Sequence, residues 1–132
     1  LAIGNPVIWW AGALAILHQA WRALKQRESR AMAIVAMYLA AWLPWMPFQQ
    51  RTVFSFYSIV MLPFLVMALA GSLGSWLGAA DAGGRSRRNR AFAVGGIVLL
   101  IVIVSGFFLP HWTGQTVSYW YWQIHMWLPN WI

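Results

Sequence analysis

The sequence contains no cysteine and only two acidic residues, Glu28 and Asp81. The lack of cysteine excludes disulfides and thiolate metal sites. Both acids lie in short polar segments rich in arginine, and the apolar remainder of the chain carries no carboxylate. A carboxylate pair for general acid–base catalysis, or a hard-metal site of oxygen ligands, therefore cannot be built there from this chain alone.

Charge of either sign is also scarce. Charged residues make up 8% of the chain, hydrophobic residues make up 61%, and eleven residues are tryptophan. Charged residues normally account for about a quarter of a soluble domain. The composition therefore predicts a membrane protein.

Four segments are long and apolar enough to cross a bilayer, which takes roughly 20 residues. The predicted spans are residues 6–24, 31–47, 53–77 and 91–109. Pro44 and Pro47 are expected to end the second span, and Pro63 to kink the third. Short connections favour antiparallel neighbours. The predicted fold is an all-α membrane protein of about four transmembrane helices, followed by an aromatic interfacial tail at 110–132.

The basic residues predict the orientation of these spans. Eight of the nine lie in two connections, residues 22–30 and 81–90, and Arg51 is the ninth. Because basic loops stay in the cytoplasm, we expect these two connections inside. The N-terminus, the 44–53 loop and the tail are then outside a multi-pass plasma-membrane protein. The net charge of +7 is interpreted as a topology signal with contact to anionic lipids, and not as nucleic-acid binding.

Four further interpretations concern residues away from Arg51. The glycine- and arginine-rich run around residues 83–90 is expected to be a solvated loop. His18 is expected to snorkel or to hydrogen-bond another helix. His111 and His125 are interpreted as interfacial aromatic residues with a solvated edge. Small residues four apart in the third span, such as Gly71 and Ser75, favour a close helix–helix contact or are simply scattered.

Arg51 stands at the start of the third span, with Ser55, Tyr57 and Ser58 following it. Residues 51, 55 and 58 share one helical face. Two interpretations remain open. Arg51 anchors the helix at the lipid headgroups, or its guanidinium binds a phosphate or carboxylate, for which its geometry is well matched.

Three stretches carry a family resemblance. They are GNPVIWW at 4–10, LPW at 43–45 with RTVFSFYSIVMLPFLVMALA at 51–70, and GQTVSYWYWQIHMWLPNWI at 114–132. In order and spacing they resemble the C-terminal membrane region of the bacterial, actinobacterial-type protein O-mannosyltransferases. The resemblance covers nearly the whole chain.

This resemblance implies a GT-C fold of about eleven spans, of which the chain would be roughly the last third. Such enzymes move mannose from a polyprenyl-phosphate carrier to serine or threonine of exported proteins. Their catalytic acid lies upstream, so no catalytic residue is expected in this segment. The implied partners are the upstream polypeptide, the acceptor protein and membrane lipids. The implied donor is polyprenyl-phosphate-mannose, no cofactor is evident, and metal dependence is left open.

The resemblance also suggests site residues. Arg51 and Tyr57 match an arginine–tyrosine pattern of the family, which places them and Ser55 as candidates near the lipid phosphate or the active-site cavity. Asn5 and Trp9 match the opening motif, where a structural role in an outer loop is equally open. His125 stands where the family pattern leads us to expect arginine.

Two other functions stay open at this point. One is a small four-helix membrane scaffold or assembly subunit without catalysis. The other is a transporter fragment, which ranks last because the spans contain no acid. The first residue is leucine and no signal peptide is recognisable, so we expect a piece of a longer polypeptide.

Overall fold

The computed structural model describes residues 4–48, 55–79 and 84–127, with the side chains of 55–57 outside that description. Within these ranges every regular element is a helix. The α-helices are α1 (Pro6–Trp21), α2 (Ser29–Trp42), α3 (Leu62–Leu77), α4 (Arg85–Trp112) and α5 (Tyr119–Ile124). A π-helical turn, η1 (Arg22–Gln26), and two 3₁₀ segments, η2 (Leu43–Phe48) and η3 (Ser55–Val60), join them. The predicted all-α class is confirmed.

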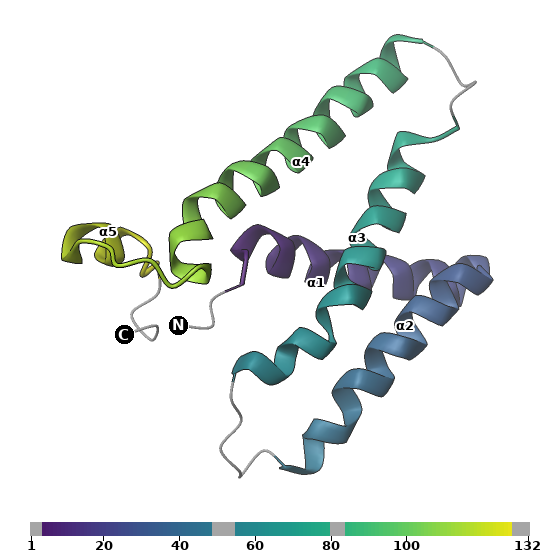
Figure 1. Cartoon of the computed structure of the whole chain (residues 1–132). Coiled ribbons are helices and arrows are strands. Elements are labelled where there is room, and N and C mark those ends of the chain that lie inside the picture. Colours follow the sequence, from purple (N-terminus) through teal and green to yellow (C-terminus); the bar gives the residue numbers. More distant parts are fainter. Residues whose placement is uncertain (1–3, 49–54, 80–83, 128–132) are drawn as a thin grey trace.

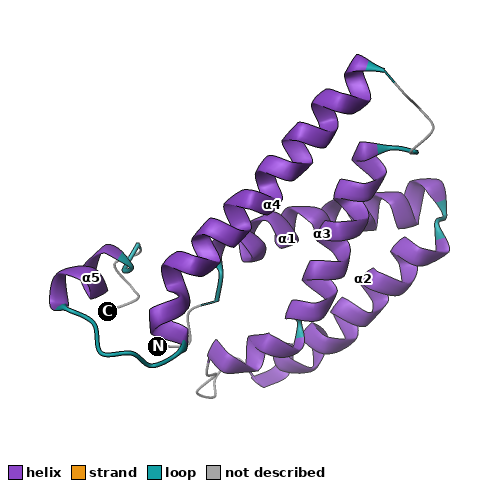
Figure 2. Ribbon diagram, turned by 45° about the horizontal axis from the view of Figure 1, so that its top comes forward, coloured by secondary structure: helices purple, strands orange, loops and turns teal. Residues whose placement is uncertain are grey.

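The helices form an open arrangement around the crossing of α1 and α3. Helices α2 and α3 run antiparallel, α1 lies across α3, and α4 returns toward the N-terminal end of α1 (Figures 1 and 2). Ala15 of α1 packs against Ala68 and Leu69 of α3 at the centre. Small residues at this crossing let the two backbones approach closely.

Three helical stretches are long and apolar enough to cross a membrane. They are Ser29–Phe48, Ser58–Leu77 and Arg85–Trp112. They correspond to the second, third and fourth predicted spans. Helix α1 has 16 residues before η1 begins, so a fourth span is not confirmed. Only 11% of the most apolar window of α4 is buried, as befits a helix surrounded by lipid or by other helices.

Prolines end one helix as predicted and begin another unexpectedly. Helix α2 ends at Trp42, two residues before Pro44, and the chain continues as η2. The expected kink at Pro63 is wrong. Pro63 lies in the first turn of α3, where its missing N–H is harmless, and the predicted third span is divided into η3 and α3.

The arginine run after Gly84 is helical and not a loop. Helix α4 begins at Arg85, and two of its arginines reach back to α3. Arg87 Nε donates to the Ala79 carbonyl at 2.9 Å, and Arg90 Nη1 donates to the Trp76 carbonyl at 3.1 Å. Arg90 thus satisfies a carbonyl in the last turn of α3 and Arg87 one just beyond it, where the helix dipole favours positive charge.

Candidate functional site

The residues predicted to face a lipid phosphate are described only in part. Arg51 lies outside the described residues. Ser55 and Tyr57 lie in the 3₁₀ segment η3, and only their backbone is described. The proposed role of these three residues therefore stays a prediction.

Asn5 has a defined structural position. It is 6% exposed and is the N-cap of α1, where its Oδ1 accepts from the backbone N–H of Val7 at 2.9 Å and of Ile8 at 3.3 Å. Its Nδ2 donates to the Ile101 carbonyl at 3.0 Å and to Ser105 Oγ at 2.8 Å. One side chain therefore caps α1 and ties it to α4.

Trp9, the other residue matched in the opening motif, lies over Gly4. A Cβ added at Gly4 would overlap the Trp9 indole nitrogen. The indole thus covers the backbone at a place where no side chain fits. Together with the Asn5 cap, this contact fixes how the chain enters α1.

The tail docks on the end of α4 through hydrogen bonds to one carbonyl. The Phe107 carbonyl accepts from the Tyr121 hydroxyl at 3.1 Å and lies 2.8 Å from His125 Nε2. The His125 and Phe107 rings stack with centroids 3.7 Å apart. His125 is fully buried, so the solvated edge predicted for it is wrong.

The second ring nitrogen of His125 also faces an acceptor. His125 Nδ1 lies 2.6 Å from the Tyr121 carbonyl. Carbonyl oxygens only accept, and a neutral imidazole donates from one nitrogen, whereas imidazolium donates from both. Which ring nitrogen donates, and to which of the two carbonyls, therefore depends on the tautomer.

His111 completes this aromatic cluster. Its ring lies 4.3 Å from that of His125 and stacks on Tyr121. Both of its ring nitrogens are buried without a hydrogen-bond partner among the described residues. Buried polar atoms of this kind usually meet water or another group. His111 therefore brings two ring nitrogens that can still form hydrogen bonds into the aromatic cluster between α4 and the tail.

The N-terminal and C-terminal motifs of the resemblance thus meet on the same part of α4. Asn5 binds at Ile101 and Ser105, and the tail binds at Phe107 and packs against His111. Ser105 was not among the residues predicted to be functional. It is the single hydroxyl residue in the apolar run 91–109, and a lone hydroxyl in such a run often bonds to a neighbouring helix.

A separate polar network lies where α1 crosses the C-terminal half of α3. His18 Nδ1 and Ser72 Oγ lie 2.9 Å apart, which confirms the predicted hydrogen bond of His18 to another helix. Gln19, 1% exposed, donates from Nε2 to Ser72 Oγ at 3.0 Å. Gly71 leaves room for this amide, since an added Cβ would lie 3.0 Å from Gln19 Nε2. The favoured packing seam at Gly71 is therefore present.

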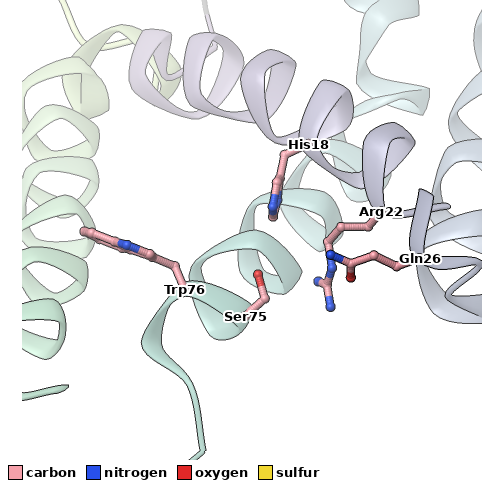
Figure 3. Close-up of a pocket in the computed structure, with 5 residues that line it drawn as sticks. All are labelled: His18, Arg22, Gln26, Ser75 and Trp76. Atoms are coloured by element: carbon pink, nitrogen blue, oxygen red, sulfur yellow. The ribbon is translucent and has the colours of Figure 1, made fainter. Parts of the chain in front are cut away.

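A pocket of about 390 Å³ opens beside this network. Its lining residues are His18, Arg22, Gln26, Ser75 and Trp76 (Figure 3). They come from α1, η1 and α3. Arg22 also forms an ion pair with Glu28. Among the described residues, no group of three histidine, aspartate or glutamate side chains is placed to hold a metal ion.

Comparison with known proteins supports the resemblance seen in the sequence. The chain is 31% identical over 131 residues, 99% of its length, to the polyprenol-phosphate-mannose–protein mannosyltransferase of Mycobacterium tuberculosis. The proteins of the same name from Mycolicibacterium smegmatis and Corynebacterium glutamicum are 30% and 26% identical over 99% and 97% of the chain. The chain is homologous to part of these enzymes. It spans about a quarter of their length.

This homology agrees with the predicted C-terminal portion of a longer actinobacterial-type mannosyltransferase. No protein-family profile matches the chain. No solved structure matches it significantly, so the GT-C fold implied by the resemblance is not confirmed.

Proposed function

We propose that this chain is the C-terminal membrane portion of a protein O-mannosyltransferase. The enzyme takes mannose from a polyprenyl-phosphate carrier and transfers it to serine or threonine of exported proteins. One observation carries the proposal. Relatives aligned over 97–99% of the chain share the name polyprenol-phosphate-mannose–protein mannosyltransferase. These relatives give no support to the alternative of a scaffold without catalysis.

The segment contributes two things to that enzyme. The first is helix packing, because the opening motif and the tail both bind α4 through partly buried hydrogen bonds. The second is donor binding by Arg51, assisted by Ser55 and Tyr57. The carrier phosphate gains negative charge as it leaves the sugar, and a guanidinium beside it stabilises that charge.

The catalytic acid and the base that takes the acceptor proton belong to the upstream part of the polypeptide. Described residues of this segment contain one carboxylate, Glu28, and it is paired with Arg22 at the basic end of the helices. On the proposed orientation this end is cytoplasmic, whereas mannose transfer to exported proteins takes place outside. The full-length reading frame is therefore expected to encode acidic residues in an outer loop after its first span.

The proposal is tested with the full-length protein in membranes. Arg51→Ala should lower mannose transfer to a serine-containing acceptor peptide by about a hundredfold to a thousandfold, as loss of one transition-state partner does. Arg51→Lys should keep part of the activity because a charge remains. Arg88→Ala removes an exposed arginine from the basic end and serves as the matched control.

The amount of folded protein separates catalysis from folding in this experiment. Equal levels of membrane-inserted enzyme with lost transfer support the donor-binding role. Loss of the folded protein in Arg51→Ala would support an anchoring role. Full activity in Arg51→Ala would refute the donor-binding role, and a full-length protein without transfer activity would refute the proposed function itself.

A further inference from the structure

The pocket beside η1 has an unusual backbone origin. Arg22 and Gln26 both line it, and they are the first and last residues of a five-residue π-helical turn. π-turns are rare and occur often at functional sites. After the turn, Arg27 adopts a left-handed backbone with φ of 51° and α2 begins two residues later. A distorted backbone thus presents two polar side chains to one space.

The polar groups of the pocket converge on that space. Figure 3 shows the side chains of His18, Arg22, Gln26 and Ser75 directed toward one another from two sides, with Trp76 extending to one side. Together they supply a guanidinium, an amide, a hydroxyl and an imidazole. Arg22 is mostly buried, its side chain 17% exposed. Guanidinium, amide and hydroxyl donors are the groups that bind phosphate oxygens.

Hydrogen bonds outside the pocket hold two of its side chains, His18 and Ser75, in place. His18 is fixed by its hydrogen bond to Ser72, and Ser72 is held by the buried Gln19. Ser75 donates its hydroxyl proton to the Ser72 carbonyl at 2.8 Å, so its oxygen has a fixed position. Support of this kind lowers the ordering cost of binding a ligand.

Electrostatics favour an anion at this position. Arg22 is paired with Glu28, but Lys25, Arg27 and Arg30 follow in the same short connection, leaving it with net positive charge. A guanidinium has five N–H donors, and the Glu28 carboxylate engages Nη2. Trp76 is 47% exposed at the end of a predicted span, which is the level at which tryptophan meets lipid headgroups.

We propose that this pocket binds the phosphate group of an anionic ligand, with Arg22 as the main contact and Gln26 and His18 as further polar contacts. The phosphate comes from an anionic membrane lipid or from free phosphate. The site is separate from the proposed donor site, because it lies at the basic end of the helices and contains no residue of the Arg51 segment.

The test uses the full-length protein, stripped of lipid in detergent. Binding is titrated with phosphatidylglycerol, with zwitterionic phosphatidylcholine and with inorganic phosphate. Arg22→Gln should weaken phosphatidylglycerol binding about tenfold or more, as loss of a charge-assisted hydrogen bond does. Lys25→Gln removes an equal charge from an exposed residue of the same turn that does not line the pocket, and should change binding less than twofold.

The ligand series identifies the source of the phosphate. Arg22-dependent binding of phosphatidylglycerol alone assigns the site to an anionic lipid. If inorganic phosphate also binds and its binding also depends on Arg22, the site recognises the phosphate group itself, free or attached to a lipid. Equal loss of binding in Arg22→Gln and Lys25→Gln would show diffuse attraction and overturn the proposal, as would unchanged binding in Arg22→Gln.

A second variant covers the case in which Arg22→Gln does not fold. Glu28→Gln removes the carboxylate that competes for Arg22 and should tighten binding severalfold. Unchanged or weaker binding in Glu28→Gln would contradict the assignment. Because these experiments measure binding and not transfer, their result is independent of the proposed enzymatic function.

Discussion

Asn5 and Ser105 lie one hundred residues apart and are joined by a hydrogen bond of 2.8 Å. The same Asn5 amide also donates to the Ile101 carbonyl, while its oxygen caps α1. A motif that looks like a loop signature in the sequence is therefore also a link between two helices. The first prediction concerns this link.

Asn5→Asp should keep the cap of α1 and lose the bond to the Ile101 carbonyl, because a carboxylate accepts but does not donate, whereas the Ser105 hydroxyl can turn and donate to it. Asn5→Ala should lose both functions. We expect about 1 kcal/mol for the cap and about 1–3 kcal/mol for the polar groups left unpaired on α4. Thermal unfolding of the full-length protein in detergent measures both variants. Asn89→Ala, at an exposed position of α4, is the control. Equal stability of Asn5→Ala and wild type would refute the link.

Two glycines of α3 provide a matched pair. Gly71→Ala places a Cβ 3.0 Å from Gln19 Nε2 and should disturb the network of Gln19 and Ser72. The expected cost is about 1–3 kcal/mol, as for other overpacking substitutions. Gly74→Ala meets nothing within 4 Å among the described residues and should be neutral or stabilising, because alanine favours helix. Denaturation midpoints that rank the two variants in the reverse order would contradict the observed seam.

The docking of α5 on α4 depends on His125. His125→Phe keeps an aromatic ring but removes the polar contact of Nε2 with the Phe107 carbonyl of α4, so α5 should detach more readily and become sensitive to protease. The loss of this contact at a fully buried residue should cost about 1–3 kcal/mol. Limited proteolysis of the tail measures the effect. Gln123→Phe, at an exposed position of the same helix, should leave the tail protected. Equal protection of the His125→Phe tail would show that stacking alone holds it.

Orientation is tested by labelling, since this chain has no cysteine of its own. In a full-length protein freed of other cysteines, Ser86→Cys should react only with a reagent admitted to the cytoplasm. Thr116→Cys, on the connection before α5, should react with an impermeant reagent from outside. Both positions are exposed, so access reflects side and not burial. The reverse pattern would overturn the predicted topology.

Composition and patterning gave the helical membrane class and the position of most helices. The second, third and fourth predicted spans overlap helices of the required length. The errors concern residues whose structure depends on context. Pro63 permits either a kink or a helix start, and the sequence offers no way to choose between them. The arginines after Gly84 are helical, and the partners of Arg87 and Arg90, the carbonyls of Ala79 and Trp76, depend on how the chain folds back.

The residues of the candidate site were also predicted only in part. Asn5 was recognised from the opening motif, but its partners on α4 depend on long-range packing. For His18 the sequence left snorkelling and a hydrogen bond to another helix both open, and the structure shows the second. The burial of His125 was not foreseen, because an aromatic tail reads as interfacial until its docking surface is known. The pocket at Arg22 depends on a π-turn, for which the sequence carries no recognised signal.

The bond from Asn5 to Ile101 also bears on the order of biosynthesis. The two residues are 96 positions apart, and at about 5–20 residues per second the partner carbonyl is made roughly 5–20 seconds after Asn5. Throughout that interval the Asn5 amide lacks its partners on α4, although α1 can already pack on α3 once α3 is made. The Asn5 amide protons must stay with water or headgroups until α4 arrives. Premature burial of the Asn5 end of α1 is thus disfavoured, and the last long helix closes the assembly.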